Sequence, residues 1–307
     1  MKKILVAYDG TPGAELALKE MTRGGFPARA EAEVLTIADA WLPPAPPDGV
    51  YADHPSYAAT HAKAQEILRE AGRTAILGAR HLHETFPEWN ITNTAKADSP
   101  AWGIIAEARR WAADLIVIGS HGRTPLERLF LGSVSYKVAA EAACSVRIAR
   151  AKRNHAERGV KILVALDHSS DAQVALDEVL NRNWRSGTEV HLVTVIDLKL
   201  KSTFLRKKSD AARVEDWIVP LHQKYKASFA ERHVTAHSHV FEGDPKNELL
   251  KHAAEWDVDC IFLGARGLEH GERLYLGTLA SAVSTRAHCT VEIVRPTAKY
   301  STDDSER

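Results

Sequence analysis

The sequence predicts two tandem α/β domains, each built on a doubly wound, mostly parallel, five-stranded sheet. Three observations support this fold class. The length of 307 residues is about twice that of a usual single domain. The segment Lys3-Ile-Leu-Val-Ala-Tyr-Asp9 returns as Lys161-Ile-Leu-Val-Ala-Leu-Asp167. Short apolar runs alternate with amphipathic segments throughout, which is typical of strand–helix units around a parallel sheet.

The repeat continues beyond the first strand. The first-strand segments are 158 residues apart (Asp9 to Asp167), whereas later pairs are 145 residues apart, as from Trp111 to Trp256. The offset shortens because the first copy has extra residues between its second and fourth strands. The proline-rich Leu42–Gly49 is the expected insertion. Fixed offsets over so many positions indicate a duplicated domain.

Each copy is expected to contain five strands. The first copy has strands near Lys3–Ala7, Ala32–Ile37, Asn90–Ala95, Asp114–Gly119 and Val146–Arg150. The second copy has strands near Lys161–Ala165, Glu189–Val195, Thr235–Phe241, Asp259–Gly264 and Thr290–Val294. The run Leu115–Ile118 is apolar throughout, as expected for a strand covered on both faces. Helical spacing of apolar residues predicts helices over Ala58–Gly78 and Ala101–Ala113, and another opens at Val134 and runs to Ala143.

The repeat also sets the domain boundaries. Domain 1 is expected over residues 1–151 and domain 2 over residues 159–297. The charged segment 152–158 is the expected linker, and residues 298–307 form a polar tail.

Composition excludes several classes of function. Hydrophobic residues make up 45% of the chain, which is enough for two packed cores. The 40 basic and 40 acidic residues balance, which argues against a nucleic-acid-binding protein. No apolar run is long enough to span a membrane, and the first residues lack a signal-peptide pattern. The three cysteines form no CxxC pair and are expected to be reduced, so the sequence predicts a cytoplasmic protein.

A glycine pattern follows the fourth strand of each copy. The first copy reads Gly119-Ser-His-Gly122, nine further residues, then Gly132-Ser133-Val134-Ser135. The second reads Gly264-Ala-Arg-Gly267, nine further residues, then Gly277-Thr278-Leu279-Ala280. Glycine at the carboxyl end of a parallel strand permits a sharp turn and the approach of a phosphate, and the start of the next helix attracts an anion. Glycine and serine at such turns are also common structural punctuation, but the same spacing in both copies favours a phosphate site.

The second copy departs from the first in two respects. The segment Thr278-Leu279-Ala280 lacks the second hydroxyl of Ser133-Val134-Ser135. Asp167 is followed by His168, whereas Asp9 is followed by Gly10. The first copy is therefore the better predicted site.

These residues resemble the universal stress protein family, whose ATP-binding members carry the pattern G-x2-G-x9-G-S/T after the fourth strand. The resemblance also covers the acid after the first strand, the proline before the third helix (Pro100 and Pro245) and the cysteine before the last strand (Cys144 and Cys289). It spans nearly the whole chain, twice. It implies a Rossmann-like fold of the adenine nucleotide alpha hydrolase type that binds ATP, or AMP or ADP, with Mg²⁺.

The resemblance implies a position for each binding residue. Asp9 would lie near the ribose or a phosphate-bound Mg²⁺, and Ile37 would flank the adenine. The expected binding residues of the first copy are Ala7, Asp9, Ile37, Gly119, His121, Gly122, Arg123, Gly132, Ser133, Val134 and Ser135. Those of the second copy are Ala165, Asp167, Val195, Gly264, Arg266, Gly267, Gly277, Thr278, Leu279 and Ala280.

The last strand of each copy suggests how the copies associate. In this strand order the last strand lies at a sheet edge with unpaired backbone groups. Single-domain members of the resembled family often dimerise through this strand in antiparallel orientation. A covalent duplication offers the same pairing at high effective concentration, so we expect an intramolecular pseudo-dimer, and a homodimer of the whole chain is compatible with it. The sequence identifies no downstream protein partner.

The function that these patterns favour is an adenine-nucleotide-binding stress-response or regulatory protein with at most slow ATP hydrolysis. P-loop, GxGxxG, GxSxG and HExxH motifs are absent, and no nucleophile–base pair is visible, so no catalytic residue is assigned. The alternative is an interaction module of the same fold that has lost nucleotide binding and acts through partner proteins. A nucleotidyl transferase or ATP pyrophosphatase is disfavoured, because Asp9–Gly13 is neither serine-rich nor histidine-rich.

No residue is assigned to a metal site of the protein. His81, His83 and Glu84, and separately His237 and His239, have spacings that place two ligands on one face. Neither set has a clear third ligand, so the sequence predicts surface histidines.

Overall fold

The computed structural model describes residues 1–41, 55–120, 131–150, 158–167, 169–197, 214–267 and 276–296. The expected insertion Leu42–Gly49, most of the expected linker and the polar tail lie outside these ranges. The first half contains β1 (Lys3–Ala7), α1 (Pro12–Met21), β2 (Glu31–Ala38), α2 (Pro55–Thr85), β3 (Asn90–Ala97), α3 (Pro100–Arg110), β4 (Leu115–Gly119), α4 (Ser133–Glu141) and β5 (Ser145–Ala149). The second half contains β6 (Lys161–Ala165), α5 (Ser170–Leu180), β7 (Glu189–Ile196), α7 (Val214–Ala230), β8 (Thr235–Glu242), α8 (Pro245–Glu255), β9 (Cys260–Gly264), α9 (Thr278–Arg286) and β10 (Thr290–Val294).

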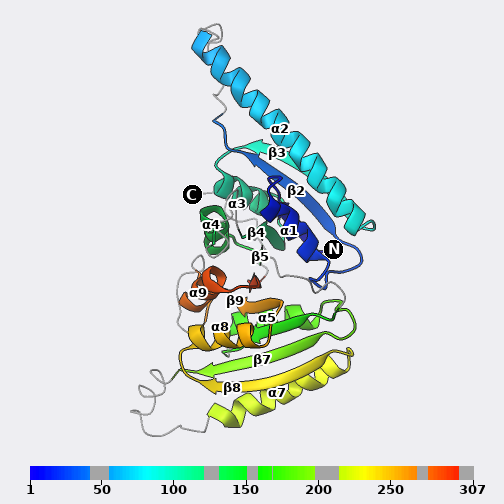
Figure 1. Cartoon of the computed structure of the whole chain (residues 1–307), viewed down its shortest axis with the longest axis vertical. Helices are drawn as coiled ribbons and strands as arrows, with labels where there is room; N and C mark the ends of the chain where they lie inside the picture. The colour runs from blue at the N-terminus through cyan, green and yellow to red at the C-terminus, as the bar shows by residue number, and fades with distance from the viewer. Residues whose placement is uncertain are drawn as a thin grey trace, which may run out of the picture.

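The strands form one ten-stranded sheet in the order β3-β2-β1-β4-β5-β10-β9-β6-β7-β8 (Figure 1). Within each half all neighbouring strands are parallel. The halves meet at β5 and β10, which pair antiparallel with Arg147 opposite Glu292. The predicted α/β class with two tandem, mostly parallel halves is confirmed.

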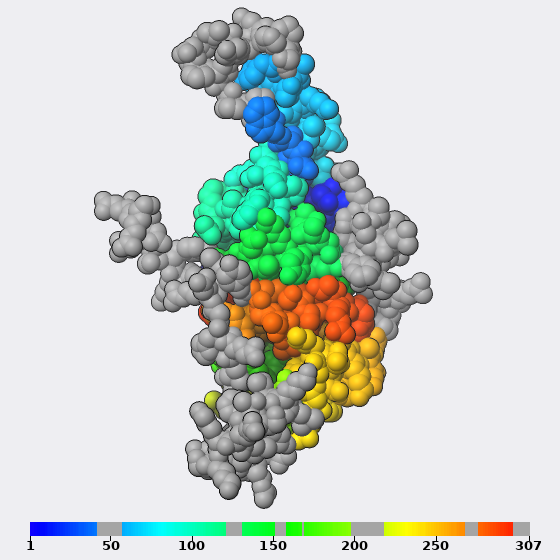
Figure 2. Space-filling view, turned by 90° about the vertical axis from the view of Figure 1, so that its left-hand side faces the viewer, coloured from blue at the N-terminus to red at the C-terminus, as the bar shows by residue number. Residues whose placement is uncertain are grey.

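The two faces of the sheet are packed differently. On one face α3, α4, α9 and α8 lie in a row across both halves (Figures 1 and 2). They cover one continuous apolar cluster, with Val146, Ile148, Val291 and Ile293 at the junction. On the other face, α1 and α2 cover one cluster and α5 and α7 cover another. The junction of the halves is therefore part of a hydrophobic core on one side only.

The other side of the junction is charged and buried. Arg147 Nη1 lies 2.9 Å from a carboxylate oxygen of Glu292, and both side chains are almost fully buried. Arg182, at the end of α5, also forms an ion pair with Glu292 and donates to the carbonyl of Gly24 at 2.8 Å. The ring of Phe26 lies 4.9 Å from the guanidinium carbon of Arg182. The carboxylate of Glu292 in the second half thus pairs with an arginine from each half, Arg147 and Arg182.

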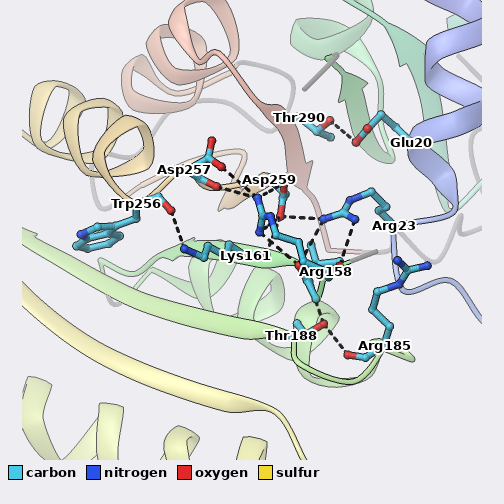
Figure 3. A network of polar contacts seen from close by, with 12 residues as sticks. Glu20, Arg23, Arg158, Lys161, Arg185, Thr188, Trp256, Asp257, Asp259 and Thr290 are labelled. Carbon is cyan, nitrogen blue, oxygen red and sulfur yellow. Dashed lines mark hydrogen bonds and ion pairs between the residues drawn. The ribbon is translucent and has the colours of Figure 1, made fainter. Parts of the chain in front are cut away.

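A second set of polar contacts joins the halves between α1 and the start of β9 (Figure 3). Arg23 Nη2 lies 3.0 Å from Asp259 Oδ2, and Arg158 contacts the same carboxylate at 3.0 Å. Thr290 donates from its hydroxyl to Glu20 at 3.3 Å. These contacts attach the end of α1 to the second half.

Two further features bear on the expectations from composition. Cys144, Cys260 and Cys289 are buried thiols. Within the described ranges, no helix combines the length and the apolar character that a bilayer crossing requires.

Replacing Glu292 with Gln should destabilise the protein strongly. Arg147 would keep a buried charge without its carboxylate partner, whereas Arg182 would keep its ion pair with Glu178. Breaking such a buried pair costs about 3–5 kcal/mol in free energy of unfolding. Urea unfolding followed by circular dichroism measures this change. The exposed Glu231→Gln is the matched control and should unfold like the parent. An unchanged midpoint for Glu292→Gln would show that the pair contributes nothing to the junction.

Candidate functional site

The glycine motif of the first half begins where β4 ends and finishes where α4 begins. The Ser120 N–H donates to the Ala149 carbonyl at 3.0 Å, and the Gly132 N–H donates to the Ser120 carbonyl at 2.9 Å. Residues 120 and 132 therefore meet at the carboxyl end of β4. The predicted binding residues His121, Gly122 and Arg123 lie outside the described residues.

The start of α4 directs backbone donors toward this strand end. Gly132 is the N-cap, and the Tyr136 N–H donates to its carbonyl at 2.8 Å as the first helical hydrogen bond. The N–H groups of Ser133, Val134 and Ser135 precede that bond and have no acceptor within the helix. Together with the helix dipole, they favour an anion at this position.

The two predicted serine hydroxyls have different surroundings. Ser135 is buried, and its hydroxyl donates to the carbonyl of Gly119 at 2.7 Å. That bond joins α4 to the end of β4 and uses the only hydroxyl proton of Ser135. Ser133 is exposed at the first position of the helix, so its hydroxyl is the one that faces solvent.

The structure gives a reason for the strand-end glycines that differs from the predicted approach of a phosphate. A Cβ atom on Gly119 would lie 2.6 Å from the carbonyl oxygen of Gly13 in α1. In the second half, a Cβ on Gly264 would lie 2.6 Å from the backbone of Asp171 in α5. Each glycine therefore allows the first helix of its half, α1 or α5, to pack on the strand.

Asp9 follows β1 at the same edge of the sheet. Its Oδ1 accepts hydrogen bonds from the Thr11 N–H at 3.0 Å and the Thr11 hydroxyl at 2.6 Å. The side chain is exposed, so its second oxygen is open to a ligand. Ala7 is buried at the end of β1, and Ile37 is half-buried near the end of β2. These residues form the carboxyl edge of the first half.

The second half repeats this geometry with differences. The Gly277 N–H donates to the Ala265 carbonyl at 2.8 Å, as Gly132 does to Ser120. The first-turn N–H groups of α9 come from Thr278, Leu279 and Ala280. Asp167 Oδ2 lies only 2.8 Å from where a Cβ on Gly267 would be. The acid after the first strand and the glycine loop are thus adjacent here.

Arg266 in the second glycine motif forms an ion pair with Asp171 in the first turn of α5. Arg266 Nε and Nη2 each lie 2.9 Å from one carboxylate oxygen of Asp171, and the Arg266 backbone N–H donates to Oδ2 at 3.2 Å. Asp171 is buried, with 2% of its surface exposed. Hydrogen bonding to Asp171 raises the pKa of Arg266. Ala165 is buried and Val195 half-buried at the neighbouring strand ends.

The family resemblance predicts that Arg266 contacts the nucleotide and gives no role to Asp171. The repeat contains the relevant information, because the 158-residue offset aligns Asp171 with Gly13 of the first copy. A glycine replaced by an acid at the start of the first helix is the difference that identifies the pair.

The comparisons with known proteins agree with the repeat. The family model described as the universal stress protein family matches residues 1–150 and again residues 160–295. A universal stress protein of Methanocaldococcus jannaschii is 27% identical over 151 residues, which are 45% of this chain and 84% of that protein. Universal stress protein YxiE of Bacillus subtilis is 29% identical over 147 residues, 44% of this chain and 98% of that protein.

Solved structures resemble the whole chain. A universal stress protein from Archaeoglobus fulgidus superposes with a TM-score of 0.62 at 21% identity, covering 95% of this chain and 98% of that one. A putative universal stress protein from Pseudomonas aeruginosa gives a TM-score of 0.61 at 20% identity, covering 97% of this chain and 94% of that one. At these identities the likeness establishes the fold.

A stack of imidazole rings lies away from the glycine loops, on β7, β8 and α8. His191 Nδ1 is 3.1 Å from His239 Nε2, and the Trp256 ring is 4.7 Å from the His191 ring and 4.4 Å from the His239 ring. His237 and His252 complete the stack. His237 and His239, expected to be surface histidines, are half-buried and stack with His191. Among the described residues, no group of three ligands has metal-binding geometry.

The stack should make the stability of the second half depend on pH. Burial, the neighbouring His237 and His239, and then Lys161 lower the pKa of His191 to about 4. The unfolded chain binds the proton near pH 6.5, so stability is complete above that pH and falls by up to about 3 kcal/mol as the pH drops toward 4. Urea unfolding at several pH values measures this loss.

His191→Leu should remove part of that pH dependence. The exposed His83→Leu is the control and should keep the parent's dependence. If His191→Leu also keeps it in full, His191 does not titrate as inferred.

Proposed function

Because the chain belongs to the universal stress protein family, we propose that it binds an adenine nucleotide, ATP or its products ADP and AMP, at the glycine motif of its first half. The observation that carries the proposal is the start of α4. There, three first-turn N–H groups and the exposed Ser133 hydroxyl meet the carboxyl end of β4. This is the edge at which open α/β sheets bind ligands.

Each group at this edge has a role in the proposed complex. The phosphates accept hydrogen bonds from the N–H groups of Ser133, Val134 and Ser135 and from the Ser133 hydroxyl. Asp9 keeps Oδ1 on Thr11, which holds the carboxylate in place, and presents Oδ2 to the ribose or to Mg²⁺. A carboxylate and phosphate oxygens suit Mg²⁺. Ile37 contributes an apolar surface beside the base.

The proposed role of binding is regulatory rather than catalytic. Hydrolysis requires a group that activates water, and the family resemblance assigns Asp9 to the ribose or to Mg²⁺ rather than to a water molecule. A nucleotide that binds and is released slowly would report the nucleotide state of the cytoplasm to a partner protein during stress. Mass spectrometry of small molecules released from freshly purified protein would identify the nucleotide.

Ser133→Glu should abolish nucleotide binding without harming the fold. A glutamate in the first turn of a helix is favourable to the helix dipole, but its charge repels a phosphate at the same N–H groups. We expect the dissociation constant for MgATP to rise at least about tenfold, measured by isothermal titration calorimetry.

Ala58→Glu is the matched control, because it adds the same charge near the start of another helix. Ala58 is exposed on α2, which projects beyond the sheet (Figure 1). It should bind MgATP like the parent. Equal affinity for the folded Ser133→Glu variant would place the nucleotide elsewhere or remove it from the function.

Any ATP hydrolysis should be slower than about 1 s⁻¹, the lower end of ordinary enzyme turnover. Phosphate release under saturating MgATP measures it. Ser133→Glu serves as the control, because activity that persists in this variant comes from a contaminant. If turnover exceeds that limit and is lost in both Ser133→Glu and Asp9→Ala, the prediction is wrong and the protein is an ATP-dependent enzyme.

A further inference from the structure

We infer that the ion pair between Asp171 and Arg266 closes the nucleotide site of the second half, so that each chain holds one nucleotide. This inference rests on the proposed function of the first half. It gives the two copies different roles, although both retain the glycine pattern.

The Asp171 carboxylate occupies the position of an anion in the second loop. It accepts the backbone N–H of Arg266, which belongs to the loop expected to surround a phosphate. Its two oxygens also accept hydrogen bonds from Nε and Nη2 of the Arg266 guanidinium, each at 2.9 Å. Such bidentate pairs are among the strongest ionic contacts. A phosphate entering this loop would have to displace a carboxylate that already has three donors.

In the first half, a glycine stands where the second half has Asp171. The residue that corresponds to Asp171 is Gly13, whose carbonyl oxygen contacts the end of β4. Gly13 has no side chain, so no carboxylate reaches the end of β4 from this position of α1. This replacement adds to the two differences in sequence between the copies and places a carboxylate at only one of the two positions.

Electrostatics add to the obstruction. Asp167 lies against Gly267, so two carboxylates, Asp167 and Asp171, border the second loop. Arg266 forms the ion pair with Asp171, and Arg295 interacts electrostatically with the same carboxylate, so among the described residues Asp167 is the carboxylate without an arginine partner. A nucleotide phosphate would bring further negative charge to this site, and like charges in a partly desolvated position repel strongly. At the end of β1 in the first half, the corresponding acid is Asp9, which Mg²⁺ can bridge to the phosphates.

A purely structural role for the pair is the competing explanation. Asp171 is in the first turn of α5, where an acid favours the helix dipole. That role predicts a change in stability and no change in nucleotide stoichiometry. Counting bound nucleotides therefore separates the two explanations.

Asp171→Ser should open the second site. Equilibrium dialysis with MgATP should find one nucleotide per parent chain and two per Asp171→Ser chain. Ser133→Glu blocks the first site, so the chain with this change alone should bind no nucleotide. The double variant with Ser133→Glu and Asp171→Ser should bind one. Asp177→Ser is the matched control, since it removes an exposed carboxylate from the same helix and should leave one nucleotide. If Asp171→Ser does not fold in a urea titration, Asp171→Asn keeps the size of the side chain and gives the same readout.

The outcomes distinguish this inference from the proposed function. If the parent chain binds two nucleotides and loses one of them in Thr278→Glu, the second site is open. That result would overturn the inferred closure and leave the proposed function of the first half intact. A folded Asp171→Ser chain that still binds one nucleotide would also overturn it. No nucleotide on the parent and one on Asp171→Ser would support the closure and overturn the first site. No nucleotide on either chain would overturn both.

Discussion

The antiparallel pairing of β5 with β10 is the interaction on which the rest of the molecule depends. Its two faces impose opposite requirements. Val146 and Val291 face a continuous apolar core, whereas Arg147 and Glu292 form a buried ion pair on the other side. A shift of register by one residue would turn Arg147 into the apolar core, because side chains alternate between faces. The ion pair therefore specifies the register, and the apolar face supplies most of the stabilisation.

This junction also determines where the two candidate sites lie. Strands within each half are parallel, and the halves run antiparallel to one another. The carboxyl ends of the first-half strands consequently point to the opposite edge of the sheet from those of the second half. The two glycine loops therefore cannot share one ligand. Divergence between the copies is compatible with an intact common core.

The sequence predicts the elements well where the pattern is local. The apolar runs locate β1 and β6 at their observed bounds, and the repeat predicts two similar halves. The second helix was expected to end at Gly78 but continues to Thr85, because Gly78 allows close packing on Tyr8 and does not end the helix. The contacts of Arg182 with Glu292 and of Arg266 with Asp171 join residues about a hundred positions apart. The repeat offset marks Asp171 as a replacement of Gly13, but no periodicity or spacing shows which residue Asp171 or Arg182 contacts, so the contacts themselves required the structure.

The reason for the strand-end glycines changes what the repeated motif means. Gly119 and Gly264 are required because α1 and α5 pack on the strands, and this requirement persists whether or not a ligand binds. Gly132 and Gly277 are likewise N-caps that return the chain to the strand end. A copy that loses its ligand therefore keeps its glycines for reasons of packing. The number of glycine motifs then gives an upper limit on the number of nucleotide sites, and the side chain at the position of Gly13 or Asp171 determines whether each site is open.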